Sequence, residues 1–385
     1  MTILTFTGHY IPGCKAGGPI RSLANLVECL GDEFEFRIIT SDRDGGDTEP
    51  YPGIPRNQWV SVGRAQVMYL SPGRRRLSAL ARLIRATPHD VLYLNSFFSD
   101  AFTIRPLLLR RLGLAPRAPT IVAPRGEFGC GALSVKARKK RAYRAVAKVL
   151  GLCSGVTWQA SSAAEEGEIR RIMGPRVPIA VGPDVFVVPT GDSQSAAPRV
   201  SQGAVRLVTV SRISPVKNLH WLSQALQGVQ GEVSLDLYGR VSDPDYWALC
   251  QRAFEGLPDN VTITYRGPVD HSDVPGILAR YDLFVLPTLG ENFGHAIAEA
   301  LAVGCPVLIS DQTPWHGLSE AKAGWDLPLD NPAAFAESVQ RIIDMPDAEH
   351  AEWRRGAREY IAHHSLVTQA VEANRELFAL AVRSG

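Results

Sequence analysis

Two glutamates on either side of a glycine-containing loop are the first residues of this sequence that suggest chemistry. Glu291 and Glu299 lie in GENFGHAIAEALAVGCPV, residues 290–307, where a helix is predicted over 294–303. Glu299 falls on a mostly apolar helix, and a buried carboxylate needs hydrogen-bond donors, which the vicinal hydroxyls of a ribose would supply. Glu291 could hold the hydroxyls of a second sugar. Either glutamate could instead lie on the surface or pair with an arginine.

The backbone between the two glutamates suits an anion. Amide groups in the first turn of a helix have no partner within the helix, and the helix dipole attracts negative charge there. The predicted first-turn amides are those of Asn292, Phe293, Gly294 and His295. The two acids would then hold the two sugars of a nucleotide-sugar while these amides hold its phosphates.

A second loop carries two cations five residues apart. VSRISPVKNLHWL, residues 210–222, follows a predicted strand that ends at Val210, and Asn218 is predicted to open the next helix. Arg212 can fork to two phosphate oxygens and Lys217 can act as a point charge, so the pair could hold a diphosphate between them. The alternative is a solvated basic loop.

A third loop, GHYIPGCKAGGPIRS at residues 8–22, follows the first predicted strand. Gly17 and Gly18 allow the backbone to approach a ligand closely, and Pro19 suits the first position of a helix whose start favours an anion. The pattern is not the G-x-G-x-x-G fingerprint, and no acidic residue ends the second strand, so a nicotinamide cofactor is disfavoured. An ordinary turn between a strand and a helix is the alternative.

Short apolar runs that alternate with helical segments would position these loops, a pattern typical of βα units in parallel sheets. The predicted strands are residues 3–7, 36–40, 66–70, 91–95, 120–123, 155–159, 206–210, 234–238, 261–265, 283–286 and 307–309. The predicted helices are residues 19–30, 77–86, 101–112, 131–150, 163–173, 218–228, 244–255, 273–280, 294–303, 332–344, 347–363 and 365–382.

A chain of 385 residues exceeds the size at which single cores stop growing, so two domains are expected. We predict an α/β protein with two Rossmann-like domains, over residues 1–188 and 204–364, whose parallel sheets face each other across a cleft. The polar PTGDSQSAAPRVSQG, residues 189–203, is the predicted linker. The final segment, 365–385, could pack back on either domain, the N-terminal one included. Ligands of such sheets bind at the carboxyl ends of the strands, which places the three loops at the cleft.

The composition excludes several classes of function. The chain is 45% hydrophobic and 21% charged with a formal net charge of +2, which gives no electrostatic case for nucleic acid. Its six cysteines are scattered, without metal-ligand spacing, so we expect reduced thiols, no metal and a cytoplasmic protein. No signal peptide and no apolar run long enough to span a bilayer is evident.

One basic segment suggests a membrane surface. VKARKKRAYRAVAKVL, residues 135–150, places seven cations beside an apolar strip of Val135, Ala142, Val146, Val149 and Leu150. A basic amphipathic helix can lie on the anionic inner face of a cell membrane, which would favour a polyprenyl-diphosphate-linked acceptor. A solvated helix face is an equal alternative. The short cluster 74–76 is interpreted as a solvated turn.

Four motifs of the C-terminal half together resemble the signature of retaining glycosyltransferases of family four, which have the GT-B fold. They are SRISPVKN (211–218), YRG (265–267), DLFVLP (282–287) and the opening stretch from Glu291 to Val307. The resemblance implies that Arg212 and Lys217 neutralise the donor diphosphate and that Glu299 holds the ribose. Glu291, with the amides of 292–294, would position the transferred sugar, and the segment from Arg266 to Val269 would lie along the nucleobase.

The resemblance further implies transfer of a sugar from a UDP- or GDP-linked donor to a glycan or lipid-linked acceptor, without a metal, in surface polysaccharide assembly. The N-terminal half would bind the acceptor through Asn95, Ser96, Arg125 and Glu127. The family often has histidines where Asn95–Ser96 and Arg125–Gly126 stand, so no catalytic histidine is assigned. A nucleotide-sugar epimerase of the same fold and a non-catalytic nucleotide-sugar-binding protein are the alternatives.

Overall fold

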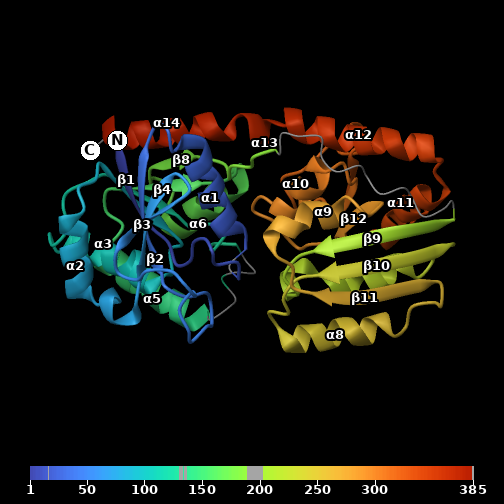
Figure 1. The fold of residues 1–385 in the computed structure, drawn as a ribbon, viewed down its shortest axis with the longest axis horizontal. Coiled ribbons are helices and arrows are strands. Elements are labelled where there is room, and N and C mark those ends of the chain that lie inside the picture. Colours follow the sequence, from blue (N-terminus) through green and yellow to red (C-terminus); the bar gives the residue numbers. More distant parts are fainter. Residues whose placement is uncertain (16, 130–132, 134–136, 189–202, 384–385) are drawn as a thin grey trace. The chain divides into compact units, whose positions relative to one another are not determined.

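The computed structural model describes the chain except for residues 16, 130–132, 134–136, 189–202 and 384–385. It divides into two compact units: residues 1–187 together with 369–385 form the first, and residues 188–368 form the second (Figure 1). All but the last residue of the predicted linker, 189–203, lies outside the described residues.

The first unit is built on one eight-stranded sheet with the order β3-β4-β2-β1-β5-β6-β7-β8. All neighbouring strands run parallel except β3, which pairs antiparallel with β4. Its strands are β1 (Thr2–Phe6), β2 (Glu35–Ser41), β3 (Trp59–Val62), β4 (Ala65–Leu70), β5 (Val91–Asn95), β6 (Thr120–Ala123), β7 (Val156–Ala160) and β8 (Ile179–Val181). Its α-helices are α1 (Gly18–Leu30), α2 (Leu77–Ala86), α3 (Arg105–Arg111), α5 (Ala137–Val149), α6 (Ala163–Met173) and α14 (Ala370–Arg383).

The second unit has a six-stranded parallel sheet with the order β11-β10-β9-β12-β13-β14. Its strands are β9 (Ala204–Val210), β10 (Glu232–Tyr238), β11 (Val261–Gly267), β12 (Leu283–Leu286), β13 (Val307–Ser310) and β14 (Gly324–Leu327). Its α-helices are α7 (Leu222–Leu226), α8 (Pro244–Phe254), α9 (Val274–Leu278), α10 (His295–Ala302), α11 (Pro332–Asp344), α12 (Asp347–His363) and α13 (Ser365–Thr368).

Packing on both faces of the sheet explains why the central strand β5 is almost entirely apolar. In β5 every residue is buried, and side chains alternate between the two faces of the sheet. Val91 and Tyr93 therefore join one core cluster of the first unit, while Leu92 and Leu94 join the other. Local signals set several helix starts: the side chains of Ser162, Asp243 and Asn331 accept hydrogen bonds from first-turn amides of α6, α8 and α11.

The differences from the predicted elements are small and have local causes. The strands β3, β8 and β14 were not predicted, because they have only three or four residues each and little apolar alternation. The helix predicted over 101–112 begins as a π-helical turn, Asp100–Ile104, before α3. The helix predicted over 218–228 begins as a 3-10 turn, η4 (Leu219–Trp221), before α7, and Asn218, predicted to open it, is left-handed and separates η4 from the 3-10 turn η3 (Pro215–Lys217).

The last predicted helix is divided between the two units. It breaks at Gln369 into α13 and α14, and α14 belongs to the first unit. The Phe378 ring meets those of Phe34, Phe36 and Tyr93 edge-on, with centroids 5.4–6.1 Å apart. Arg375 Nε also donates to Glu33 Oε2 at 2.7 Å. The C-terminal helix therefore completes the core over β1, β2 and β5.

We expect Phe378→Ala to lower the free energy of unfolding of the first unit by about 3–5 kcal/mol, because it leaves a cavity beneath three rings. Denaturant unfolding followed by tryptophan fluorescence measures this. Val382→Ala is the matched control on the same helix: Val382 is 44% exposed, and its loss should cost less than about 0.5 kcal/mol. Equal effects of the two substitutions would contradict this account of α14.

Candidate functional site

The candidate site of the second unit lies where two chain directions diverge. In its sheet β9 and β12 are neighbours, but the chain runs outward from β9 toward β11 (Figure 1) and, in the opposite direction, from β12 toward β14. The loops that leave the carboxyl ends of two such strands separate and leave a crevice, which is where open α/β sheets bind ligands. Here the loops are residues 211–218 and 287–294, the two that the sequence had singled out.

The two loops are joined by hydrogen bonds. The amide of Leu289 and the hydroxyl of Thr288 both donate to the carbonyl of Val216, at 2.7 and 3.0 Å. Ser310 Oγ, at the end of β13, donates to the carbonyl of Thr288 at 2.5 Å. The backbone around the candidate residues is therefore held in place by three strands.

Lys217 and Glu291 meet across these loops. Lys217 Nζ lies 2.5 Å from Glu291 Oε1, and the two side chains are only 14% and 11% exposed. The amide of Glu291 donates to the carbonyl of Gln312 at 3.1 Å, which anchors the loop next to the pair. Removing one partner of such a shielded pair would leave an uncompensated charge.

Two glycines are required by the site's backbone. Gly239 follows β10 with φ +136°, and a Cβ there would stand 1.8 Å from the carbonyl oxygen of Ser211. Gly294 caps α10 in the left-handed conformation, and a Cβ there would stand 2.9 Å from Ile297 Cδ1. A side chain at either position would displace a loop that carries candidate residues.

The start of α10 differs from the prediction. The helix begins at His295, so Asn292, Phe293 and Gly294 precede it and only His295 belongs to the first turn. The Phe293 ring is buried, 5.1 Å from that of Trp315, and Trp315 Nε1 donates to the carbonyl of Phe293 at 2.5 Å. Trp315 therefore packs against this loop and holds its backbone by a hydrogen bond. Gly294, predicted to be helical, instead has a positive φ and precedes the helix, because the loop ends there in a sharp turn.

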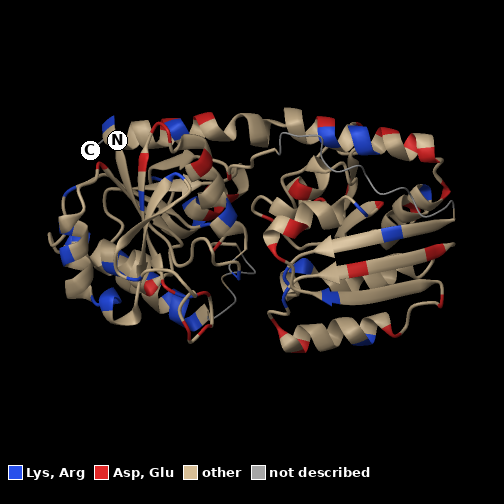
Figure 2. Ribbon diagram, viewed as in Figure 1, with Lys and Arg blue, Asp and Glu red and all other residues tan. Residues whose placement is uncertain are grey.

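The other predicted donor residues belong to the same unit. Glu299 lies on α10, with a side chain 12% exposed and His271 Nδ1 3.4 Å from its carboxylate. Arg266, at the end of β11, is half-exposed and pairs with Asp236 at 3.0 Å, and Val269 lies in the following loop. Arg212 is exposed, and no carboxylate of the described residues lies within ion-pair distance of it. Figure 2 shows basic residues gathered beyond the carboxyl ends of β10 and β11.

The predicted acceptor residues of the first unit lie at the carboxyl ends of β5 and β6, in a strained backbone. Ser96 and Arg125 have φ of +75° and +56°, unusual for residues other than glycine. Glu127 accepts from Ser96 Oγ at 2.6 Å and from the amides of Phe97 and Phe98 at 2.5 and 3.1 Å. These contacts give Glu127 a structural role in the loop after β5, whereas its contact with an acceptor stays a prediction.

Arg125 lies in a buried polar network. It pairs with Asp184, the two side chains being 6% and 7% exposed, and donates to Asn95 Oδ1 at 3.1 Å and to Tyr93 Oη at 2.5 Å. Burial raises the pKa of Tyr93 to about 12, although the Arg125 charge acts in the opposite direction. Gln159 accepts from Tyr93 and donates to Asn374 of α14. Arg125 thus positions the ends of β5 and β6, and acceptor contact by Asn95 or Arg125 stays a prediction.

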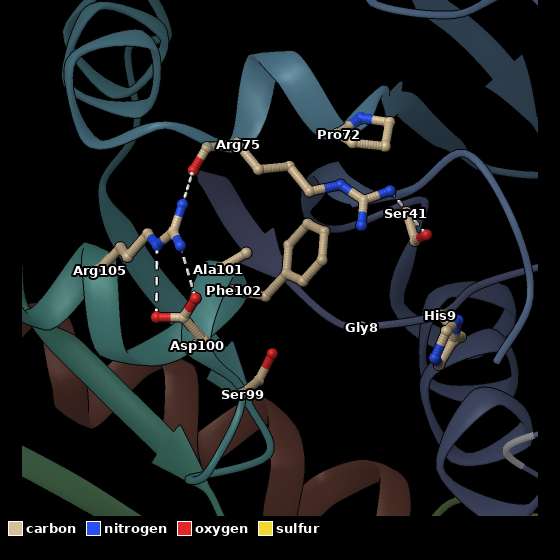
Figure 3. A pocket seen from close by; sticks show the side chains of 10 residues that line it. All are labelled: Gly8, His9, Ser41, Pro72, Arg75, Ser99, Asp100, Ala101, Phe102 and Arg105. Carbon is tan, nitrogen blue, oxygen red and sulfur yellow. Dashed lines mark hydrogen bonds and ion pairs between the residues drawn. The ribbon is translucent and has the colours of Figure 1, made fainter. Parts of the chain in front are cut away.

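A pocket of about 360 Å³ in the first unit was missed by the sequence analysis (Figure 3). Its lining residues are Gly8, His9, Ser41, Pro72, Arg75, Ser99, Asp100, Ala101, Phe102 and Arg105. The interpretation of 74–76 as a solvated turn is wrong for Arg75, whose side chain is 20% exposed and pairs with Asp42 at 3.0 Å. The sequence signal for a pocket was that these arginines follow the carboxyl end of the predicted strand 66–70 by only a few residues. Gly17, with φ +66°, caps α1 beside Gly18.

The basic helix is largely exposed over the residues that the structure describes. It is described as α5, Ala137–Val149, and Val135 and Lys136 lie outside the described residues. Tyr143 and Ala147 face the core, where the Tyr143 ring lies 5.1 Å from that of Phe97. No helix in the described ranges has the length and apolar character needed to cross a bilayer.

Comparison with known proteins agrees with this geometry. Residues 204–345 match the family described as glycosyl transferases group 1, and residues 17–191 match the glycosyl transferase 4-like domain. The chain therefore belongs to the family-four type of glycosyltransferases, and its two parallel-sheet units have the GT-B fold. Sucrose-phosphate synthase from Thermosynechococcus elongatus aligns with a TM-score of 0.71 and 20% identity, over 99% of this chain and 100% of that one.

Two curated relatives match part of the chain. The UDP-N-acetylglucosamine–peptide N-acetylglucosaminyltransferase GtfA subunit of Streptococcus gordonii is 25% identical over 207 residues, 50% of this chain and 38% of that protein. Phosphatidyl-myo-inositol mannosyltransferase of Mycobacterium leprae is 28% identical over 176 residues, 43% of this chain and 46% of that protein. The chain thus spans less than half the length of either relative.

We expect Trp315→Phe to weaken nucleoside diphosphate binding by roughly tenfold, because the carbonyl of Phe293 loses its buried donor and the loop loosens by about 1–3 kcal/mol. Calorimetric titration with UDP and GDP measures this. Trp59→Phe, on the edge strand β3 of the first unit, is the matched control and should bind as the parent protein does. Unchanged affinity in both variants would remove Trp315 from the site.

Proposed function

We propose that this protein is a retaining glycosyltransferase that moves a sugar from a UDP- or GDP-linked donor to a glycan or lipid-linked sugar acceptor in surface polysaccharide assembly. The observation that carries the proposal is the shielded Lys217–Glu291 pair between the loops after β9 and β12, inside the residues that match the family. The names of the two curated relatives, one a UDP-N-acetylglucosamine enzyme and one a mannosyltransferase, support a hexosyl donor.

Donor binding would exchange partners at this pair. A diphosphate offers Lys217 a more negative partner than Glu291 does, and the hydroxyls of the transferred sugar offer Glu291 donors in return. One ligand that carries an anion next to hydroxyl groups would then compensate both the Lys217 ammonium and the Glu291 carboxylate, so neither charge would be buried without a partner. Free inorganic phosphate or a free sugar supplies only half of the exchange. This selects for a nucleotide-sugar.

Catalysis would then rest on charge stabilisation and alignment. In the retaining reaction that the family resemblance implies, the bond from the anomeric carbon to the phosphate oxygen breaks while the acceptor oxygen bonds to that carbon on the same face. The acceptor's proton passes to the departing phosphate oxygen, so no protein nucleophile is needed. A cation about 4 Å from the phosphate is worth ~4 kcal/mol at an effective dielectric of ~20, roughly a thousandfold in rate.

A thermal-shift screen against UDP, GDP and ADP identifies the base, and a transfer assay with the stabilising nucleotide's sugars tests the function. Transfer to an added glycan supports the proposal. Conversion of the donor without any acceptor would favour an epimerase, and donor binding without turnover would favour a binding protein.

We expect Lys217→Ala and Arg212→Ala each to lower turnover by roughly 10²–10³, because each removes a cation that would stabilise the departing diphosphate. Glu291→Gln distinguishes the role of Lys217 toward the diphosphate from the role of Glu291 toward the sugar. It removes the carboxylate that pairs with Lys217, so nucleoside diphosphate should bind at least as tightly while turnover falls. Arg252→Ala, an exposed cation on α8, is the control and should leave turnover unchanged. We also expect a metal chelator to leave the rate unchanged, and near-normal rates in both cation variants would refute the phosphate role.

We propose in addition that α5 docks on an anionic membrane surface near the acceptor. Val146, Val149 and Leu150 are 52%, 86% and 47% exposed although they are apolar. Arg111 Nε donates to the carbonyl of Leu150, which places the turn with exposed Leu112 beside them. The cations Arg138, Lys139, Arg141 and Lys148 are exposed on the same helix, and each could contribute about 1 kcal/mol at a charged surface.

Replacing Lys139, Arg141 and Lys148 by Gln should weaken binding to phosphatidylglycerol-containing vesicles by roughly a hundredfold, the equivalent of about 3 kcal/mol. Co-sedimentation at two salt concentrations measures this. The matched triple Arg252, Arg280 and Arg355 to Gln, which changes the net charge equally on the other unit, should bind as the parent does. Vesicle binding that survives the α5 substitutions would show that this helix is only a solvated face.

A further inference from the structure

The pocket of the first unit lies at the same topological position as the candidate donor site of the second. In the first sheet β1 stands between β2, the next strand in the chain, and β5, where the chain resumes on the other side. Gly8 and His9 follow β1, Ser41 ends β2, and residues 99–105 follow β5. A ligand of this unit is therefore expected in the crevice outside the carboxyl ends of β1 and β5. The pocket lies in this crevice.

Charged side chains lie in the wall of the pocket and directly behind it. Asp42, whose side chain is fully buried, is approached by three arginines: Arg43 at 2.9 Å, Arg75 at 3.0 Å and Arg56 at 3.9 Å. Arg105 pairs with Asp100 on the opposite wall at 2.5 Å. Asp44, behind His9, accepts hydrogen bonds from the amides of Cys14, Lys15 and Gly45. Of the three arginines beside Asp42, Arg75 lines the pocket.

Arg75 is held so that one edge of its guanidinium faces the open space. Its Nε donates to the carbonyl of Leu70, and its Nη2 to Leu70, Ser41 and Asp42. Nη1 donates to no described residue, and Figure 3 shows that nitrogen directed into the pocket beside Phe102. The Phe102 ring lies 5.6 Å from the guanidinium carbon, and Arg105 Nη1 donates to the carbonyl of Arg75 at 2.5 Å. Arg105 and Phe102 therefore fix Arg75 in a preorganised position.

His9 is a second lining residue with a polar atom that lacks a hydrogen-bond partner among the described residues. Its Nδ1 is buried and has no hydrogen-bond partner among the described residues, and the nearest acid, Asp44 Oδ1, is 3.8 Å away. A buried polar atom without a partner is costly unless a ligand or a water satisfies it. Ser99, Asp100 and the backbone of Gly8 supply further polar groups, while Pro72, Ala101 and Phe102 supply an apolar wall.

We propose that this pocket binds the sugar acceptor through an anionic group on it, a phosphate or a carboxylate held by Arg75. The inference rests on the proposed glycosyl transfer and names the class of its acceptor. A guanidinium edge with a free N–H matches the oxygens of either group, and the apolar wall matches the C–H face of a sugar ring. The acceptor's anionic group would thereby set which of its hydroxyls is left exposed at the mouth of the pocket for glycosyl transfer.

The test measures binding first, with the donor site saturated by the nucleoside diphosphate found in the screen, so that probes reach only the second site. The probes are a hexose phosphate, a hexuronate, a short-chain isoprenyl diphosphate and the neutral hexose. We expect at least one anionic probe to bind tenfold or more tightly than the neutral hexose. Which anion binds distinguishes a phosphosugar, a uronic acid and a lipid-linked acceptor. Equal or undetectable binding of all four would overturn the proposal.

Arg75→Lys keeps the charge but removes the fork, and should weaken the anionic probe at least tenfold while nucleoside diphosphate binding stays unchanged. Arg74→Gln, an exposed neighbour outside the pocket, is the matched control and should change neither. If Arg75→Lys does not fold, His9→Gln gives the same comparison from the opposite wall. Transfer to a neutral acceptor that is unaffected by Arg75→Lys would refute the pocket's role and leave the proposed function intact. Anion binding without any transfer would instead refute the function and leave only a binding site.

Discussion

The contact between Lys217 and Glu291 is the central interaction of the second unit, because the order of its strands and the hydrogen bonds between its loops bring these two residues together. Two opposite charges that are largely shielded from water must stay together or be compensated by a ligand. The sheet order places β9 beside β12, so the loops that carry the two residues leave neighbouring strands. Hydrogen bonds to Val216 hold the loops together, and Trp315 holds the backbone of one of them by a hydrogen bond. The pair is therefore preorganised for a ligand that can satisfy both charges.

The first unit repeats the topological constraint with different chemistry. Its strand order also reverses, between β1 and β5, and the pocket lies at that reversal. Here the shielded acid is Asp42, which three arginines approach, and one of them, Arg75, lines the pocket. Glu127 and Arg125, further along the sheet edge, bind groups of their own unit and hold the neighbouring loops in a left-handed backbone. Rigid loops of this kind can present a few polar groups with defined geometry.

The helices α5 and α14 have similar amphipathic sequences but differ in how much of their apolar surface is buried. Both α5 and α14 are amphipathic, yet α14 buries Leu377 and Phe378 in the core, whereas α5 buries only Ala147 and leaves its valines exposed. The network from Arg125 through Tyr93 and Gln159 to Asn374 links α14 to the ends of β5 and β6. A helix from the end of the sequence thus contributes to the same sheet edge at which the first unit's loops are formed.

The sequence by itself determined most strands and helices, because apolar runs and caps such as Ser162 are local signals. It also indicated the loops with Lys217 and Glu291, since motif and spacing are written along the chain. It could not indicate that these two side chains pair or that Arg75 lines a pocket rather than a turn, and it left open which domain α14 joins. Those facts depend on which strands become neighbours and on which side chains are then shielded from water, and only the tertiary structure decides both.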